Sequence, residues 1–156
     1  MNYHVDIQDA CATPLPVPEH VLLQWVELAL SEKTTAELTL RFVDIDEMTH
    51  LNHTYRSKNA PTNVLAFPAT LPQTIELELP LLGDVIICPA VLAQESQTLN
   101  KPLIAHWAHI VIHGTLHLLG YDHIQEEDAC LMQAIETKLL AQLGFEDPYH
   151  AEENKN

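Results

Sequence analysis

The spacing of apolar residues changes along this chain, from strand-like alternation in the first half to helical periodicity in the second. Residues 3–7 and 36–43 alternate between apolar and polar side chains, which is the pattern of a strand with one buried face. Shorter β-prone runs at 64–67 and 83–88 are bounded by proline or glycine. These segments predict a sheet of about four strands.

Helical spacing of apolar residues occupies most of the remaining chain. A first helix is expected after Pro18, because proline favours the first turn of a helix. A second is expected through 48–56, with Asp44 or Asp46 as its N-cap. Three helical segments then follow one another, over about 89–99, 102–118 and 125–143. Because strands and helices alternate early and helices dominate late, we predict an α/β (α+β) fold with helices packed on one mixed sheet. The order of the strands stays open.

The length of the chain bounds its organisation. A chain of 156 residues is long enough for one sizeable core, so we predict a single domain over 1–150 and a disordered tail over 151–156. No apolar stretch approaches the ~20 residues of a membrane-spanning helix. The N-terminal segment lacks the basic start and apolar run of a secretory signal. The expected location is the cytoplasm, with no membrane partner.

The charge is strongly negative but unevenly distributed. Seven Lys and Arg against 22 Asp and Glu give a net charge of −15, which argues against a general nucleic-acid binder. Residues 48–75 and 96–121, however, contain no acids, and they hold Arg56, Lys58 and Lys101. If these two acid-free stretches meet in the fold, an acidic protein would carry a neutral to positive groove.

The most informative segment is His113-Gly-Thr-Leu-His117-Leu-Leu-Gly120-Tyr-Asp-His123. Histidines four residues apart lie one turn apart on one helical face, so His113 and His117 can converge on one ion. Gly120 can end the helix in a left-handed conformation and turn the chain back, which lets His123 supply a third ligand. Three neutral imidazoles leave a coordination position open, as in catalytic zinc sites. The pattern predicts a metallohydrolase domain with one metal ion, on a late helix and the turn after it.

The histidine spacing predicts where the metal binds, but it says less about which metal is bound and which reaction is catalysed. Zn²⁺ is the expected ion, although imidazoles also suit nickel, copper and iron. The metzincin peptidases share the spacing, but Gly114 stands where those enzymes carry the glutamate that activates water. Peptidase chemistry is therefore not expected. The chain has no Cys-x-x-Cys pair, so a thiolate zinc site is not suggested either.

Two polar residues accompany the predicted ligands. His109 lies about 12 Å from His117 along a helix, too far to share an ion directly. We expect His109 either to contact a ligand histidine from behind or to line the same pocket. The alternative is that it is simply packed in the protein interior. Asp122 precedes His123 and could orient a ligand imidazole or accept a proton; a solvated turn aspartate is the alternative.

Four segments together, including the histidine motif, carry a specific pattern: LNHTYRSKNAPTNVLAFP (51–68), LLGDVIIC (81–88), AHWAHIVIHGTLHLLGYDH (105–123) and GFEDPYH (144–150). The chain resembles the YbeY family of bacterial endoribonucleases in these segments, with one departure at Ala66, where related sequences often have serine. The resemblance implies metal binding by His113, His117 and His123, and a functional role for Arg56.

The same resemblance implies what the protein does. It implies a metal-dependent, single-strand-specific endoribonuclease in ribosomal RNA processing, notably 3′-end maturation of the small-subunit RNA, with a part in ribosome quality control. The implied partners are single-stranded ribosomal RNA, small-subunit proteins and assembly factors.

The residues themselves are compatible with cleavage of a phosphodiester. A dication can polarise a phosphoryl oxygen and lower the pKa of water. Arg56 offers a guanidinium fork suited to phosphate, and it is the candidate catalytic residue together with Asp122. Lys58 offers a mobile positive charge, and Lys58 and Asn63 are the candidate substrate-binding residues.

Selectivity for single strands requires flat side chains that stack on bases, and Tyr55 and Trp107 are the candidates. Two alternative functions remain open. One is a metal-dependent hydrolase of a non-nucleic-acid substrate, which would not need Arg56 beside the ion. The other is a ribosome-assembly binding module with a structural metal, which would be closed by four protein ligands.

Overall fold

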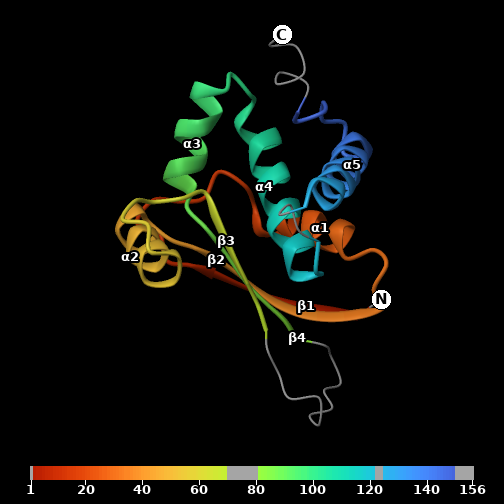
Figure 1. Ribbon diagram of the computed structural model, residues 1–156, viewed down its shortest axis with the longest axis horizontal. Coiled ribbons are helices and arrows are strands. Elements are labelled where there is room, and N and C mark those ends of the chain that lie inside the picture. Colours follow the sequence, from red (N-terminus) through yellow and green to blue (C-terminus); the bar gives the residue numbers. More distant parts are fainter. Residues whose placement is uncertain (1, 70–80, 122–124, 150–156) are drawn as a thin grey trace.

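The computed structural model describes residues 2–69, 81–121 and 125–149, and Figure 1 shows the arrangement of its elements. Strands and helices alternate in the first half of the chain, and helices dominate the second, as predicted. The elements are β1 (Asn2–Asp9), α1 (Glu19–Ala29), β2 (Thr35–Phe42), α2 (Ile45–Arg56), β3 (Val64–Pro68), β4 (Leu81–Ile87), α3 (Pro89–Thr98), α4 (Leu103–Leu118) and α5 (Glu126–Gln142).

The four strands form one mixed sheet in the order β1-β2-β4-β3. The pairs β1–β2 and β2–β4 are parallel, whereas β3 pairs antiparallel with β4 at the edge. This confirms the predicted α+β fold with a single mixed sheet. The strand order, which periodicity could not supply, places β4 in the interior of the sheet between β2 and β3.

Helices cover both faces of the sheet, and the alternation along β4 shows how. Val85 and Ile87 belong to the main core, together with residues of α1, α4 and α5. Ile86 and Cys88 belong to a second cluster with Met48 of α2, and Figure 1 shows α2 on the far side of the molecule from α1 and α5. Because both faces of β4 are buried, its sequence is a nearly continuous apolar run rather than an alternating one.

Helix α4 occupies the centre of the helical layer, where it contacts α1, α3, α5, β3 and β4. Most of its residues are buried, including Trp107, Val111, Ile112 and Leu116. A helix enclosed on so many sides holds its side chains in fixed positions, because packed interiors resist displacement. This helix carries two of the three predicted metal ligands, His113 and His117.

Asp44 is the N-cap residue of α2, as expected, but its side chain makes no capping hydrogen bond. The carboxylate instead accepts a hydrogen bond from the backbone N–H of Ala12 at 3.1 Å, which ties the segment after β1 to the start of α2. Within the described residues, no helix is long and apolar enough to cross a membrane.

Candidate metal centre

Four histidines of α4 form a stripe along one face of the helix, which we call the histidine stripe: His106, His109, His113 and His117. Their spacing of three, four and four residues keeps the imidazoles on one side of a helix. Neighbouring ring centroids are 6.4, 6.0 and 4.6 Å apart along the stripe. The shortest separation joins His113 and His117, whose rings are nearly perpendicular, at 79°. The two rings therefore lie close enough to ligate one ion.

Gly114 explains why this helix differs from a peptidase helix with the same histidine spacing. A Cβ atom added at this position would lie 2.6 Å from Cγ1 of Val85 and 3.2 Å from Cγ2 of Val64. Residue 114 therefore faces the sheet, and the glycine lets α4 approach β3 and β4 closely. A glutamate would not fit at this position, so it cannot supply the general base found there in metzincins.

The turn after α4 has the predicted conformation. Gly120 adopts a positive φ of 101°, with space around its Cα, so the backbone conformation rather than crowding favours glycine. Its N–H donates to the carbonyl of His117, and the N–H of Tyr121 donates to that of Leu116. These bonds close the helix and turn the chain back. The predicted third ligand, His123, and Asp122 lie outside the described residues.

Glu136 of α5 is the buried carboxylate beneath the histidine stripe. Its side chain is 0% exposed. Nδ1 of His113 lies 2.5 Å from Oε1, and Nε2 of His109 lies 3.0 Å from Oε2. The hydroxyl of Tyr149 also donates to Oε2. Burial opposes ionisation of this carboxyl, but the hydrogen bonds from the two histidines outweigh it and lower the pKa of Glu136 to about 2.

This cluster could hold a metal ion. One ligand atom from each of His109, His113 and Glu136 lies within 4.8 Å of the others, and imidazole with carboxylate is a donor set that suits zinc. A cleft of about 340 Å³ opens against His113, Glu136 and Tyr149. The residues present therefore fit a metal centre on the late helix, in the region that the histidine spacing predicts.

Glu136 was not identified from the sequence as part of the site. A signal for it existed: Glu136 continues the helical face of α5 that holds the buried residues Met132, Leu139 and Leu140. A lone acid on an apolar helical face is expected to have a partner, because an unpaired buried charge is costly. The identity of that partner depends on the packing of α5 against α4.

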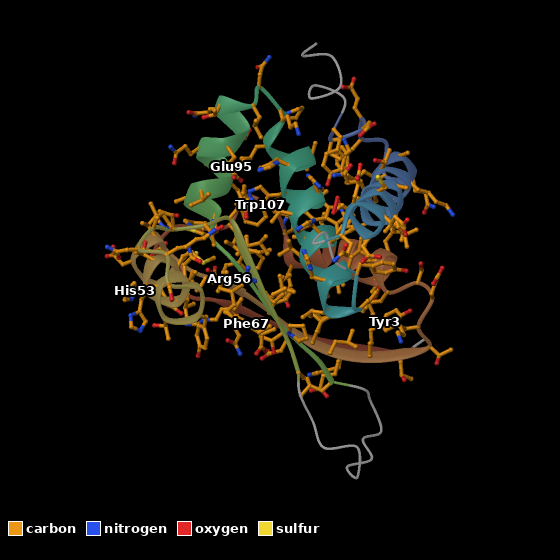
Figure 2. The ribbon with its side chains drawn as sticks, in the orientation of Figure 1. Tyr3, His53, Arg56, Phe67, Glu95 and Trp107 are labelled. Atoms are coloured by element: carbon orange, nitrogen blue, oxygen red, sulfur yellow. The ribbon has the colours of Figure 1, made fainter. Side chains whose placement is uncertain are left out.

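A second carboxylate contacts the N-terminal part of the stripe. Glu95 of α3 accepts a hydrogen bond from Nε2 of the buried His106 at 2.9 Å and from the side-chain amide of Asn63 at 3.2 Å. Partial burial opposes ionisation of Glu95, but these hydrogen bonds outweigh it and lower its pKa. Figure 2 shows Glu95 on the side of α3 that faces α4. The amide of Asn63, a predicted substrate-binding group, is thus held within the protein.

Arg56 and Lys58 lie at the end of α2, where the loop 57–63 begins. Ser57 ends the helix in the left-handed conformation, with φ 58°, and the buried Asn52 donates to the carbonyl of Ala60 at 2.8 Å. Both cationic side chains are exposed. Arg56 pairs with no carboxylate among the described residues. Figure 2 shows Arg56 on the side of α2 towards the strands.

The two candidate stacking residues have different environments. Tyr55 is 63% exposed, and its ring lies 5.0 Å from that of Phe67 on β3, so it can meet a ligand. Trp107 is buried in the main core and stacks on Phe42, with ring centroids 5.4 Å apart. The prediction that Trp107 could stack on bases is therefore wrong, because the residue lies on the face of α4 that packs on the sheet.

The two acid-free stretches meet in the fold, which is the condition on which the predicted groove depends. Helix α4 packs on β3, and position 114 faces Val64. Lys101, however, donates to the backbone carbonyl of Pro148 and is partly buried. Its ammonium group ties the start of α4 to the C-terminal segment rather than standing free beside Arg56 and Lys58.

The sequence matches a known protein family over most of its length. The family model described as endoribonuclease YbeY matches residues 14–144. A protein named endoribonuclease YbeY from Legionella pneumophila (strain Corby) is 60% identical over 156 residues, covering 99% of each chain. A protein of the same name from Psychromonas ingrahamii is 51% identical over 159 residues, covering 97% of this chain and 99% of the relative.

The fold is also found among solved structures. The solution structure of TM1509 from Thermotoga maritima matches with a TM-score of 0.56, covering 92% of this chain and 97% of that one. Its sequence identity is 22%, so this likeness concerns the fold alone.

An α+β fold with histidines along a central helix, beside a buried carboxylate, is the arrangement of a domain that could hold a metal ion. The match over residues 14–144 and the relatives at 60% and 51% identity make the assignment more specific. The chain belongs to the YbeY family of endoribonucleases.

Proposed function

We propose that this protein is a metal-dependent endoribonuclease that cleaves single-stranded RNA, with one ion held by His113, His117 and His123. The observation that carries the proposal is the full-length match to proteins named endoribonucleases. The 4.6 Å separation of the His113 and His117 rings supports it, because two imidazoles must converge to share an ion. The proposed ion is Zn²⁺.

The residues of the chain prepare this site for phosphodiester chemistry. When bound, a divalent ion supplies Lewis acidity, which neutralises charge on a phosphoryl oxygen and makes water more acidic. Glu136 holds the His113 ring from behind, at 2.5 Å. Gly114 leaves no carboxylate at the neighbouring helical position. The proton acceptor must therefore come from elsewhere, and Asp122 is the proposed group.

Arg56 is proposed to neutralise charge on the phosphate. Its guanidinium is exposed and has no carboxylate partner among the described residues, so it remains available to a substrate. The planar fork can donate two parallel hydrogen bonds to a phosphate. Lys58 adds a second positive charge in the loop 57–63. The hydrogen bond from the side-chain amide of Asn52 to the carbonyl of Ala60 restrains the backbone of this loop. Asn63 is proposed to contact substrate through its side-chain oxygen, since its amide group is engaged by Glu95.

The proposed substrate is ribosomal RNA, at the 3′ end of the small-subunit RNA, with small-subunit proteins and assembly factors as partners and a part in ribosome quality control. Processing of ribosomal RNA in bacteria takes place in the cytoplasm, which is the proposed location. Neither a non-nucleic-acid hydrolase nor a purely structural metal module would be named an endoribonuclease, so membership of the family favours this proposal over those two alternatives.

Metal content and RNA cleavage, measured separately, test the proposal. Alanine variants of His113, His117 and His123 should fold and lose the stoichiometric ion, and with it cleavage of a single-stranded RNA. Arg56→Ala should keep the ion and lose about 10²-fold in cleavage rate, as expected for a group that stabilises transition-state charge. Arg56→Lys should recover only part of this loss, because it lacks the fork.

Protein purified without a metal column provides the reference for metal content. The double-stranded form of the same RNA serves as the substrate control. The proposal would be wrong if two of the three histidine variants kept the ion, or if Arg56→Ala cleaved at the wild-type rate.

A further inference from the structure

Glu136 has an environment that fold stability alone does not explain. Among the described residues it is the one fully buried acid, at 0% exposure. Burying a charge is costly, and a well-packed apolar side chain in its place is often neutral or stabilising. Helix α5 already presents apolar residues on this face. A glutamate here therefore calls for a reason other than packing.

The contact between Glu136 and His113 determines which ring nitrogen of a neutral His113 carries the hydrogen. An ionised carboxylate only accepts hydrogen bonds, so Nδ1 of His113, 2.5 Å away, must carry the proton. In a neutral ring this leaves the lone pair on Nε2, the atom that a metal ion requires. The neighbouring His117 ring lies 4.6 Å from the His113 ring. A ligand histidine whose other nitrogen donates to a carboxylate is a recurring arrangement in metal sites.

The carboxylate is itself held in place. Oε2 accepts hydrogen bonds from Nε2 of His109 at 3.0 Å and from the hydroxyl of Tyr149. The three partners come from α4 and from the segment after α5, so the carboxylate cannot rotate without breaking at least one of these bonds. Glu136 thus presents Oε1 to His113 in a fixed direction.

We propose that Glu136 is a positioning residue of the metal centre, which holds His113 as the Nδ1–H tautomer and directs Nε2 towards the ion. Tyr149 and His109 hold Glu136 in turn. This inference rests on the proposed function, because it assumes that His113 and His117 are ligands of the same ion. It differs from an arrangement in which Glu136 itself is a ligand together with His109 and His113.

The affinity for Zn²⁺, measured in competition with a chromophoric chelator and without RNA, tests the inference. Glu136→Gln keeps the shape of the side chain, but its amide can donate as well as accept and carries no charge. We expect Zn²⁺ to bind about 10- to 100-fold more weakly. Tyr149→Phe removes only the hydroxyl that holds Glu136, and it should weaken binding in the same direction but less.

Glu95→Gln is the matched control. It removes the charge of the other carboxylate that pairs with the stripe, through His106 at 2.9 Å, and should leave Zn²⁺ affinity unchanged. In the metal-free protein, the ¹⁵N resonance of His113 Nε2 should be that of an unprotonated nitrogen. In Glu136→Gln it should shift towards a mixture of tautomers, a change that a merely structural role would not produce.

The outcomes separate this inference from the proposed function. If Glu136→Gln, or Tyr149→Phe should the former not fold, binds Zn²⁺ as tightly as the wild type, the positioning role is wrong while the metal site stands. If His117→Ala keeps the ion and His109→Ala loses it, Glu136 is a ligand, and the inference is overturned. If the wild-type protein binds no ion, the proposed function itself fails.

Discussion

Gly114 has no side chain, and this allows helix α4 to lie close to the sheet. The nearest atoms to an added Cβ belong to Val85 and Val64, on two different strands. Alanine is the better helix former by about 1 kcal/mol, so propensity alone favours a substitution here. Overpacking a close-packed interior costs about 1–3 kcal/mol, and a 2.6 Å contact requires a shift of the helix or the strand.

Gly114→Ala should therefore destabilise the protein, by about 1–2 kcal/mol net in chemical denaturation. The physical reason is the contact with Cγ1 of Val85, so the effect should shrink in a Val85→Ala background. A double-mutant cycle measures this coupling. A Gly114→Ala variant that is as stable as the wild type would show that α4 can move away from the sheet at no cost.

At the scale of elements, one carboxylate joins three of them. Glu95 lies on α3, accepts a hydrogen bond from His106 on α4, and accepts another from Asn63, the residue before β3. These bonds lower its pKa below the ordinary value of 4.5. A carboxyl with a lowered pKa in the folded state stabilises the fold above its unfolded pKa, and this stabilisation is lost as the pH falls through the folded value.

The effect of Glu95→Gln on the melting temperature should therefore depend on pH. Near pH 7 the variant should melt below the wild type, because its uncharged amide makes weaker bonds to His106 and Asn63. The difference should shrink as the pH falls below the ordinary carboxyl pKa of 4.5 and through the lowered pKa of Glu95, because the protonated wild type then resembles the variant. Thermal unfolding of both proteins between about pH 7 and pH 3 tests this. A difference that stays constant across the range would mean that the charge of Glu95 is not what joins the three elements.

At the scale of the whole molecule, a net charge of −15 repels RNA, so any attraction must be local. The acid-free segments that meet at α4 and β3 carry few cations. Lys101 is tied to Pro148, which leaves Arg56 and Lys58, with the bound ion, as the proposed contacts. Few cations imply few neutralised phosphates and a weak dependence of binding on salt.

The slope of log affinity against log salt for a single-stranded RNA should lie at about −1 to −3, with ~0.7 per phosphate. Lys58→Gln should make the slope shallower by ~0.7, the contribution of about one phosphate contact. Lys101→Gln, its matched control, should leave the slope unchanged, because that ammonium group contacts Pro148. Removal of the ion by a chelator should weaken binding and flatten the slope. A slope steeper than about −5, or binding indifferent to the chelator, would place the RNA elsewhere on the protein.

The sequence by itself determined the features that depend on neighbours along the chain. Apolar periodicity predicted the helices and two of the strands, since burial on one face requires a period near two in strands and near 3.6 in helices. The other two strands were predicted from short β-prone runs bounded by proline or glycine. The four-residue spacing of His113 and His117 placed them on one helical face, and Gly120 marked the turn, which has the expected positive φ. These are local properties, set within a few residues.

Only the tertiary structure decided which of these faces meet. Glu136 and His113 come together because α5 packs on α4, although 23 residues separate them in the chain. Trp107 faces Phe42 and Lys101 meets Pro148 for the same kind of reason. Periodicity assigns a side chain to a face of its own helix, but the partner of that face depends on how separate elements pack, which is a property of the whole core.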